Sequence, residues 1–197
     1  MGYSISWYAF SASAAEAVFA SLGLSKTGTE QDSPESMICA AGMKTGWKVL
    51  WYDRYDCPFL KEDDLSRLSE SCDIVCCRVE EHVMASSSEF WRKGEILWAI
   101  SHEGENGPVG FDFAGQLPDS LAEIRKEMEA LQEAAGGLDA GVDYIFEIPL
   151  RVAQRLVGFK HDTDPGDQQL GRFEVYERVA SRGGLLSRIF KAKGGSA

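Results

Sequence analysis

The sequence has little positive charge, and this shortage argues against one class of partner. Its 197 residues contain 20 Lys and Arg against 31 Asp and Glu, which gives a formal net charge of -11 at pH 7. A protein that binds a phosphate backbone needs a basic surface. We therefore expect no nucleic-acid partner, and we expect an acidic surface that attracts basic groups.

Long apolar runs and secretion features are also absent from the sequence. No apolar run approaches the roughly 20 residues that cross a bilayer, and the opening segment, MGYSISWYAF, lacks the basic residues of a secretory signal. The chain has five cysteines, an odd number that is typical of reduced thiols rather than of a disulfide framework. These features predict a cytoplasmic protein with no integral membrane segment.

The chain lacks the short motifs that mark common enzymes and nucleotide-binding proteins. GxGxxG, GxxxxGK[ST], GxSxG and HExxH do not occur. Cys72 and Cys76 have no second pair of ligands nearby, and the acidic loop that begins at Asp162 has Phe173 where a calcium loop needs glutamate. We therefore expect no cofactor and no bound metal, and we expect Cys57, in a charged turn, to be exposed.

What the sequence does contain is the pattern of an α+β protein with an antiparallel sheet. Residues 73–114 hold four consecutive strand-like runs separated by short turn segments, one of them Lys93-Gly94. Short turns favour a meander, because parallel strands need long crossovers. A hairpin is predicted over residues 37–52, a first strand before residue 11, and a last strand over 173–179. Residues 25–35 are polar and predict a mobile loop.

A few helices are predicted to pack against this sheet. The longest spans residues 119–135, with a capping box of Ser120 and Glu123 and two glycines after its end. Its apolar stripe, Leu121, Ile124, Met128 and Leu131, is expected to pack on strands from residues 74–113. Shorter helices are predicted near residues 13–22, where Ser13 and Glu16 form a capping box, near 60–72, and from 149 to 157.

The charge balance divides the chain into a domain and a tail. After Leu170 there are six basic residues and two acidic ones, whereas the preceding part is strongly acidic. We therefore expect a single α+β domain over residues 1–180 and a basic amphipathic tail over 181–197. The tail is predicted to dock on the acidic domain or on a second copy of the chain, and truncation after Gly183 is predicted to leave the domain folded.

The strand that begins at Ile74 supplies the candidate site. Its alternation places Arg78, Glu80 and His82 on one face, opposite the apolar Val75 and Val79. A row of this kind can bind an anion or transfer protons, or it can be a solvated face held by ion pairs. The full set of candidate binding residues is Arg78, Glu80, His82, Trp91, Trp98 and His102, although the spacing of His102 is typical of the end of a core-facing strand.

Two functions are compatible with these features, and neither assigns a catalytic residue. The first is an acidic binding or interaction protein, such as an immunity-type inhibitor of a basic partner. The second is a small-molecule binder or enzyme that uses Arg78, Glu80 and His82. A deep pocket around these side chains would favour the second function, and a flat acidic face would favour the first.

Overall fold

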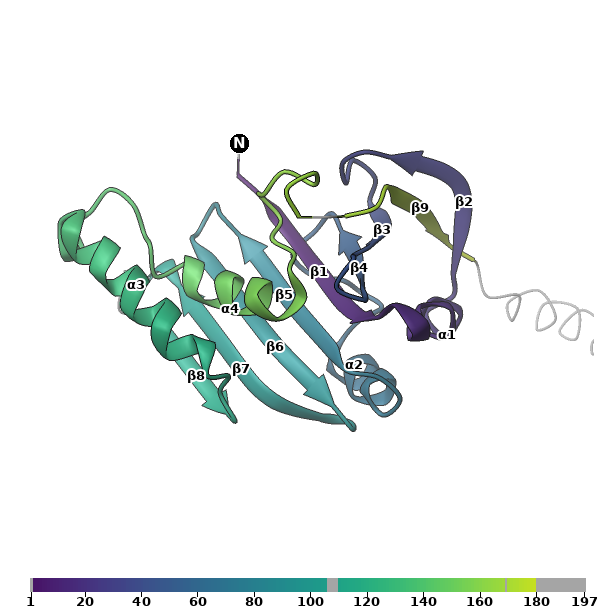
Figure 1. Cartoon of the computed structure of the whole chain (residues 1–197), viewed down its shortest axis with the longest axis horizontal. Coiled ribbons are helices and arrows are strands. Elements are labelled where there is room, and N and C mark those ends of the chain that lie inside the picture. The colour runs from purple at the N-terminus through teal and green to yellow at the C-terminus, as the bar shows by residue number, and fades with distance from the viewer. Residues whose placement is uncertain (1, 106–109, 169, 180–197) are drawn as a thin grey trace, which may run out of the picture.

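The fold is an open antiparallel sheet with helices on both faces. The structure, a computed structural model, describes residues 2–105, 110–168 and 170–179. The nine strands in these residues lie in the order β2-β9-β3-β4-β1-β5-β6-β7-β8 (Figure 1). The strands are β1 (Ser4–Ser11), β2 (Leu24–Gln31), β3 (Ile38–Gly42), β4 (Trp47–Tyr52), β5 (Ile74–Glu80), β6 (Ala85–Arg92), β7 (Glu95–Glu103), β8 (Phe111–Gly115) and β9 (Phe173–Arg178). The predicted α+β class is confirmed.

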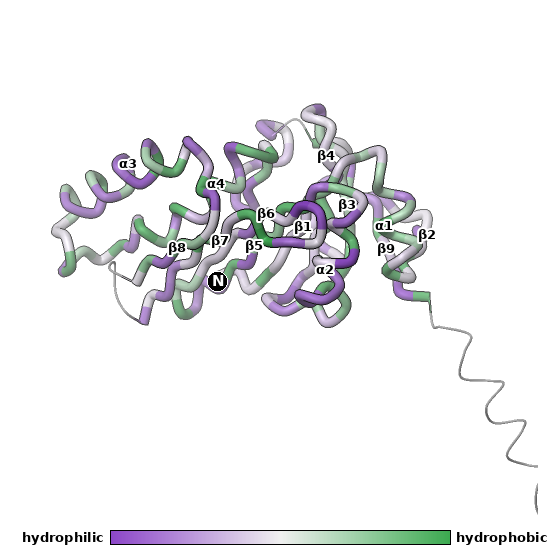
Figure 2. Tube along the Cα trace, turned by 90° about the horizontal axis from the view of Figure 1, so that it is seen from below, coloured by the Kyte–Doolittle hydropathy of each residue, from purple (hydrophilic) through white to green (hydrophobic). Residues whose placement is uncertain are grey.

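The helices cover different parts of the two sheet faces. Viewed in Figure 2, α3 and α4 lie above the strands, and α2 lies below them. One core therefore forms under α3 and α4, around Trp7, Val75 and Ile100. A second core forms on the opposite face under α1 and α2, around Phe10, Leu50 and Leu65. The helices are α1 (Ala15–Ser21), α2 (Glu62–Ser69), α3 (Ser120–Ala134) and α4 (Glu147–Val157), with short 3-10 turns at Ala12–Ala14 and Gly137–Asp139.

The predicted meander of residues 73–114 is confirmed as β5, β6, β7 and β8. Each strand pairs in antiparallel fashion with the next one along the chain. Lys93 and Gly94 connect β6 and β7 with φ values of 55° and 81°, the left-handed backbone that the commonest tight hairpin turn requires. The predicted turn at 104–108 lies largely outside the described residues. The predicted hairpin of β3 and β4 is also present.

The prediction of a loop over residues 25–35 is wrong for most of its length. Residues 24–31 form β2, an edge strand that pairs with β9. Leu24 is its only large apolar side chain, and five of its eight residues are exposed. Pairing with β9, together with polar side-chain contacts such as that of Thr27 with the carbonyl of Val175, holds this strand, so its sequence carries no period-two signal.

Two details of the predicted helices are also wrong. Neither α1 nor α3 has a side-chain hydrogen bond at its N-cap, so the boxes predicted at Ser13 and Ser120 do not form. On α3, Leu121, Ile124 and Met128 are buried as predicted, but Leu131 is 39% exposed. Its neighbour Gln132 is buried instead. The amide of Gln132 donates to the carbonyls of Gly137 and Val142 and accepts from the backbone N–H of Tyr144, so this residue anchors the following loop.

The two remaining predictions concern the C-terminal tail and membrane-spanning segments. The basic tail predicted over 181–197 lies outside the described residues, and so do its predicted docking and self-association. Within the described part of the chain, no helix is long and apolar enough to cross a membrane.

Candidate interaction surface

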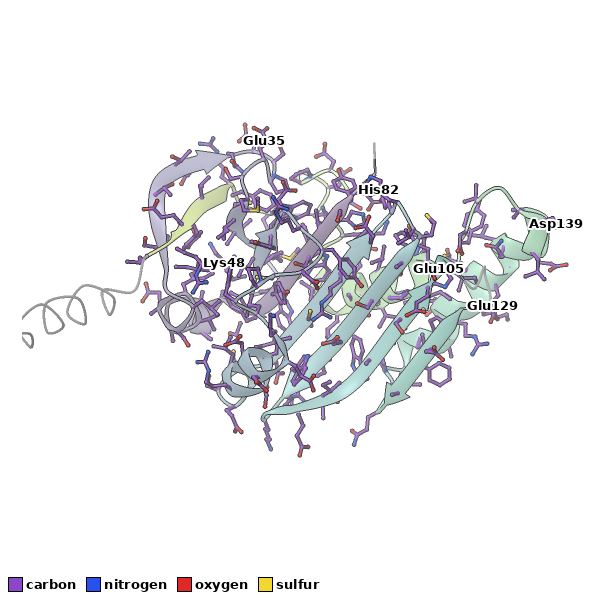
Figure 3. All side chains as sticks on the ribbon, turned by 180° about the vertical axis from the view of Figure 1, so that it is seen from behind. Glu35, Lys48, His82, Glu105, Glu129 and Asp139 are labelled. Carbon is purple, nitrogen blue, oxygen red and sulfur yellow. The ribbon has the colours of Figure 1, made fainter. Side chains whose placement is uncertain are left out.

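The strands β5, β6, β7 and β8 present one face that no helix crosses. Figure 3 shows these strands from that side, with α2 only at one end. The strand register places Arg78 opposite Ser87, Ser87 opposite Ser101, and Ser101 opposite Asp112. Directly opposed residues on paired strands share a face. The same register therefore gives two further rows, Glu80–Ala85–Glu103 and Glu89–Ala99–Ala114. We call this face the platform; it consists of Arg78, Glu80, Ala85, Ser87, Glu89, Ala99, Ser101, Glu103, Asp112 and Ala114.

The centre of the platform is built from small side chains. Five of its ten residues are alanine or serine, and they lie on adjacent strands. The other face of the same strands carries large buried side chains such as Phe90, Trp98 and Ile100. Alanine and serine are not among the residues that strands favour, so backbone preference does not explain them. What they do produce is a low, flat area in the middle of the sheet.

The charges on the platform are mainly negative. Four of its ten residues are carboxylates, and only Arg78 is basic. The Nη1 of Arg78 lies 2.7 Å from Oε1 of Glu89, whose second oxygen accepts the indole N–H of Trp91 at 2.9 Å. Glu103 and Asp112 form no ion pair with any residue that the structure describes. The platform therefore has a surplus of negative charge.

Glu80 is held at the end of β5 by its neighbours. Ser4 donates its hydroxyl to Oε2 at 2.5 Å, and Nδ1 of His82 lies 2.7 Å from Oε1. The hydrogen bond from Ser4, together with those from His82, lowers the pKa of the Glu80 carboxyl despite some desolvation. Glu80 is therefore charged at neutral pH, and it adds to the negative character of the platform.

A turn borders the platform on the side of the second core. Tyr55, in the turn that links β4 to α2, is half-buried near Arg78, and burial raises the pKa of its phenol. Together with Arg78 and Ser87, this turn lines a cavity of about 530 Å³. The cavity also includes Tyr8, whose buried hydroxyl has no hydrogen-bond partner in the described structure. The platform is thus flat in its centre and hollowed at one edge.

The structure separates the predicted site residues between the two faces of the sheet. Arg78 and Glu80 lie on the platform as the alternation predicts, and the buried Trp91 lies beside them on the same face. Trp98 and His102 belong to the opposite, helix-covered side, where His102 is buried at the end of the core-facing β7 as its spacing indicates. These two residues do not meet the other four.

The predicted strand face does not extend to His82. β5 ends at Glu80, and His82 lies in the turn that follows, where its side chain is exposed (Figure 3). The prediction that His82 shares the strand face is therefore wrong, because the chain turns toward β6 two residues earlier than the alternation suggests. His82 still contacts Glu80 through its ring nitrogen.

Sequence reasoning missed the residues that give the platform its shape. Ser87, Ser101 and Asp112 come together only through the register of three strands. The available signal was the recurrence of small residues at every second position of β6 and β7. Its meaning depends on knowing that these positions lie opposite one another.

The cysteines do not form a site. Cys76 and Cys77 contact the second and the first core, respectively, as adjacent strand residues must. Cys57, which we expected to be exposed, is only 4% exposed, and burial raises the pKa of its thiol to about 11. The prediction was wrong because the turn after β4 folds back over the second core. Among the described residues, no three His, Cys, Asp or Glu side chains are grouped so as to hold a metal ion.

Three comparisons with known proteins found no match to this chain. No protein-family model matches the chain, no curated protein is similar to it, and no solved structure matches its fold.

Proposed function

We propose that this chain is a binding protein whose platform receives a basic protein partner, in the manner of an immunity-type inhibitor. The observation that carries the proposal is the set of alanines and serines between the carboxylates. Short side chains let the larger side chains of a partner approach the sheet closely, and such close approach is needed for the dense packing found at the core of protein interfaces. The surrounding carboxylates would speed the encounter with a positively charged partner.

The platform offers carboxylates that are ready for such a partner. Glu103 and Asp112 lie on β7 and β8 without an ion pair among the described residues, so a basic side chain can bind them without displacing an existing contact. Arg78 is already paired with Glu89. A partner that brings arginines or lysines therefore gains two new charge-assisted contacts while the internal pair stays in place.

The experiment isolates a partner and then tests the surface with purified proteins. Cross-linked complexes are recovered with tagged full-length protein, the basic partner is identified, and its affinity is measured by surface plasmon resonance. Ser101→Trp places a large side chain in the flat centre, and Thr29→Trp places one at an exposed position on β2. We expect Ser101→Trp to abolish binding and Thr29→Trp to leave it unchanged.

Charge reversal tests the electrostatic part of the proposal. Glu103→Lys with Asp112→Lys should slow association by about tenfold at low salt, and this difference should shrink as the salt concentration rises. Glu16→Lys with Asp139→Lys makes the same change in net charge at exposed positions away from the platform. The proposal fails if both pairs have equal effects, if Ser101→Trp binds normally, or if no basic protein is recovered.

A second candidate function is the binding of a small anion at the edge of the platform. The cavity of about 530 Å³ beside Arg78 and the unpartnered hydroxyl of Tyr8 favour it. A carboxylate ligand would accept from both groups. Titration with acetate and butyrate, compared between the native protein and Tyr8→Phe, measures this binding directly. Equal responses of the two proteins, or none, would exclude this role for Tyr8.

A further inference from the structure

A second cavity lies on the opposite side of the sheet from the platform, and segments far apart in the sequence build it. Tyr3 precedes β1, Trp51 lies on β4, and Phe159 and His161 follow α4. The loop between β2 and β3 adds Glu35 to the lining, and Figure 3 labels this residue. The cavity has a volume of about 490 Å³, which is enough for a small organic molecule.

Aromatic rings form much of its wall in a fixed arrangement. The ring of Tyr3 meets that of His161 edge to face, with centroids 4.9 Å apart and planes at 89°. It also meets Trp51 at 6.3 Å and 82°. Tyr3 is 41% exposed, whereas Trp51 is 1% exposed, so Tyr3 stands at the mouth and Trp51 at the base. These contacts give the cavity a defined shape.

Two residues that line the cavity each contain a polar atom without a partner. Nε1 of Trp51 and Nδ1 of His161 are both buried, and neither makes a hydrogen bond within the described structure. Buried polar groups in folded proteins are almost always paired, so an orphan at a cavity is typical of a site where a ligand supplies the partner. Here two such atoms belong to residues that line the same cavity.

The hydrogen-bonding roles of the two atoms are different. The indole N–H of Trp51 is only a donor. Nε2 of His161 lies 3.3 Å from Oε1 of Glu81, so the ring proton belongs on Nε2 and Nδ1 is left as an acceptor. Burial lowers the pKa of His161, which keeps the ring neutral near pH 7. A ligand that satisfies both atoms needs an acceptor for Trp51 and a donor for His161.

The charges around the cavity specify the sign of the ligand. Glu35, Asp162 and Asp164 line it, and none of its lining residues is lysine or arginine. Lys160 neutralises Asp162 in part, because its Nζ lies 2.7 Å from both carboxylate oxygens. The other two carboxylates have no basic partner among the described residues. Together with the aromatic wall, this surplus favours a cation over an anion.

We propose that this cavity is a binding site for a small organic cation that carries a hydroxyl group, an amino alcohol in its simplest form. The ammonium group donates to Nδ1 of His161 and is attracted by Glu35 and Asp164. The hydroxyl oxygen accepts the indole N–H of Trp51. The carbon chain between these groups packs on Tyr3 and Phe159. This site is independent of the platform, which lies on the other face of the sheet.

The first test uses the unaltered protein and matched ligands. Isothermal titration with 4-aminobutan-1-ol should show binding with a Kd of about 1 mM or tighter. n-Pentylamine has the same length but no hydroxyl, and it should bind about tenfold more weakly, because it leaves the Trp51 indole unpaired. Pentanoate carries the opposite charge and should not bind. Equal binding of all three compounds, or no binding of the amino alcohol, overturns the proposal.

The second test locates the binding in the protein. The indole N–H signal of Trp51, identified in the NMR spectrum by its loss in Trp51→Phe, should shift downfield on addition of the amino alcohol. Glu35→Gln removes one charge from the exposed rim and should weaken binding several-fold, and Glu16→Gln is the matched control on α1. If Trp51→Phe does not fold, Tyr3→Leu at the exposed mouth provides the alternative. An unchanged Kd in both Glu35→Gln and Tyr3→Leu contradicts the site.

Discussion

Arg78 on β5 and Glu89 on β6 form an ion pair diagonally across two strands, with Nη1 and Oε1 2.7 Å apart. Their side chains are 20% and 19% exposed, so solvent screens the pair only in part. Arg78→Ala leaves the Glu89 carboxylate with the Trp91 indole as its remaining described partner. We expect the free energy of unfolding to fall by about 1 to 3 kcal/mol, between the values for exposed and buried pairs.

Denaturant unfolding of the variant measures this loss, and a surface pair supplies the control. Arg172 pairs with Glu30 and Asp32, and all three side chains are more than half exposed. Arg172→Ala should therefore cost at most about 1 kcal/mol. If the two variants lose the same free energy, the Arg78 pair behaves as a solvated surface contact.

Replacing a side chain of α3 by alanine should change the free energy of unfolding very differently on two neighbouring sides of the helix. Met128 is fully buried in the first core, whereas Leu131 is 39% exposed. Met128→Ala should lower the free energy of unfolding by about 2 to 5 kcal/mol, because it removes buried apolar surface and leaves a cavity. Leu131→Ala should cost less than about 1 kcal/mol. Denaturant midpoints in the opposite order would mean that α3 is rotated about its axis.

The sequence predicted the parts of the fold that depend on neighbouring residues. The meander of β5 to β8 follows from alternation and short turns, both of which are local. β2 could not be found in this way, because its side chains are largely exposed and only its pairing with the distant β9 makes it a strand. The burial of Gln132 in place of Leu131 was equally hidden, since it depends on carbonyls in the loop that follows α3.

In the candidate sites, too, local features could be predicted from the sequence and features that join distant segments could not. Alternation was enough to place Arg78 and Glu80 on one face. The flat centre of the platform needed the register of Ser87 against Ser101, which no single strand contains. The cavity on the other side joins Tyr3, Trp51 and His161 across most of the chain, so no motif of fixed spacing can describe it.

Asp143 should be essential for the start of α4. Its Oδ1 accepts the backbone N–H groups of Ile145 and Phe146, and its Oδ2 lies 2.7 Å from Nε2 of the buried His102. Asp143→Ala removes all three contacts and should cost about 2 kcal/mol. Asp143→Asn keeps an oxygen for the two backbone groups, so it should cost less. Equal losses in thermal or denaturant unfolding would show that these backbone contacts contribute little.

The buried His161 should make the protein less stable in mild acid. Burial is the largest influence on its pKa and lowers it from the ordinary value of 6.5, although Asp162 and Glu81 act in the opposite direction. The unfolded chain therefore takes up a proton on His161 near pH 6.5, while the folded protein takes it up only at lower pH. The free energy of unfolding should fall as the pH decreases from about 7 toward the folded pKa.

Replacing His161 by glutamine separates this effect from that of the carboxylates. The pKa values of Asp73, Asp162 and Glu174 are lowered in the folded protein, so their contribution is lost only below their ordinary values of 3.8 to 4.5. Between about pH 7 and pH 5.5, the native protein should lose stability while His161→Gln shows a flatter profile, because the titrating group is gone. Denaturant unfolding across this range provides the comparison. Parallel profiles for the two proteins would show that His161 takes up its proton equally in the folded and unfolded states, and thus that its burial does not oppose charging.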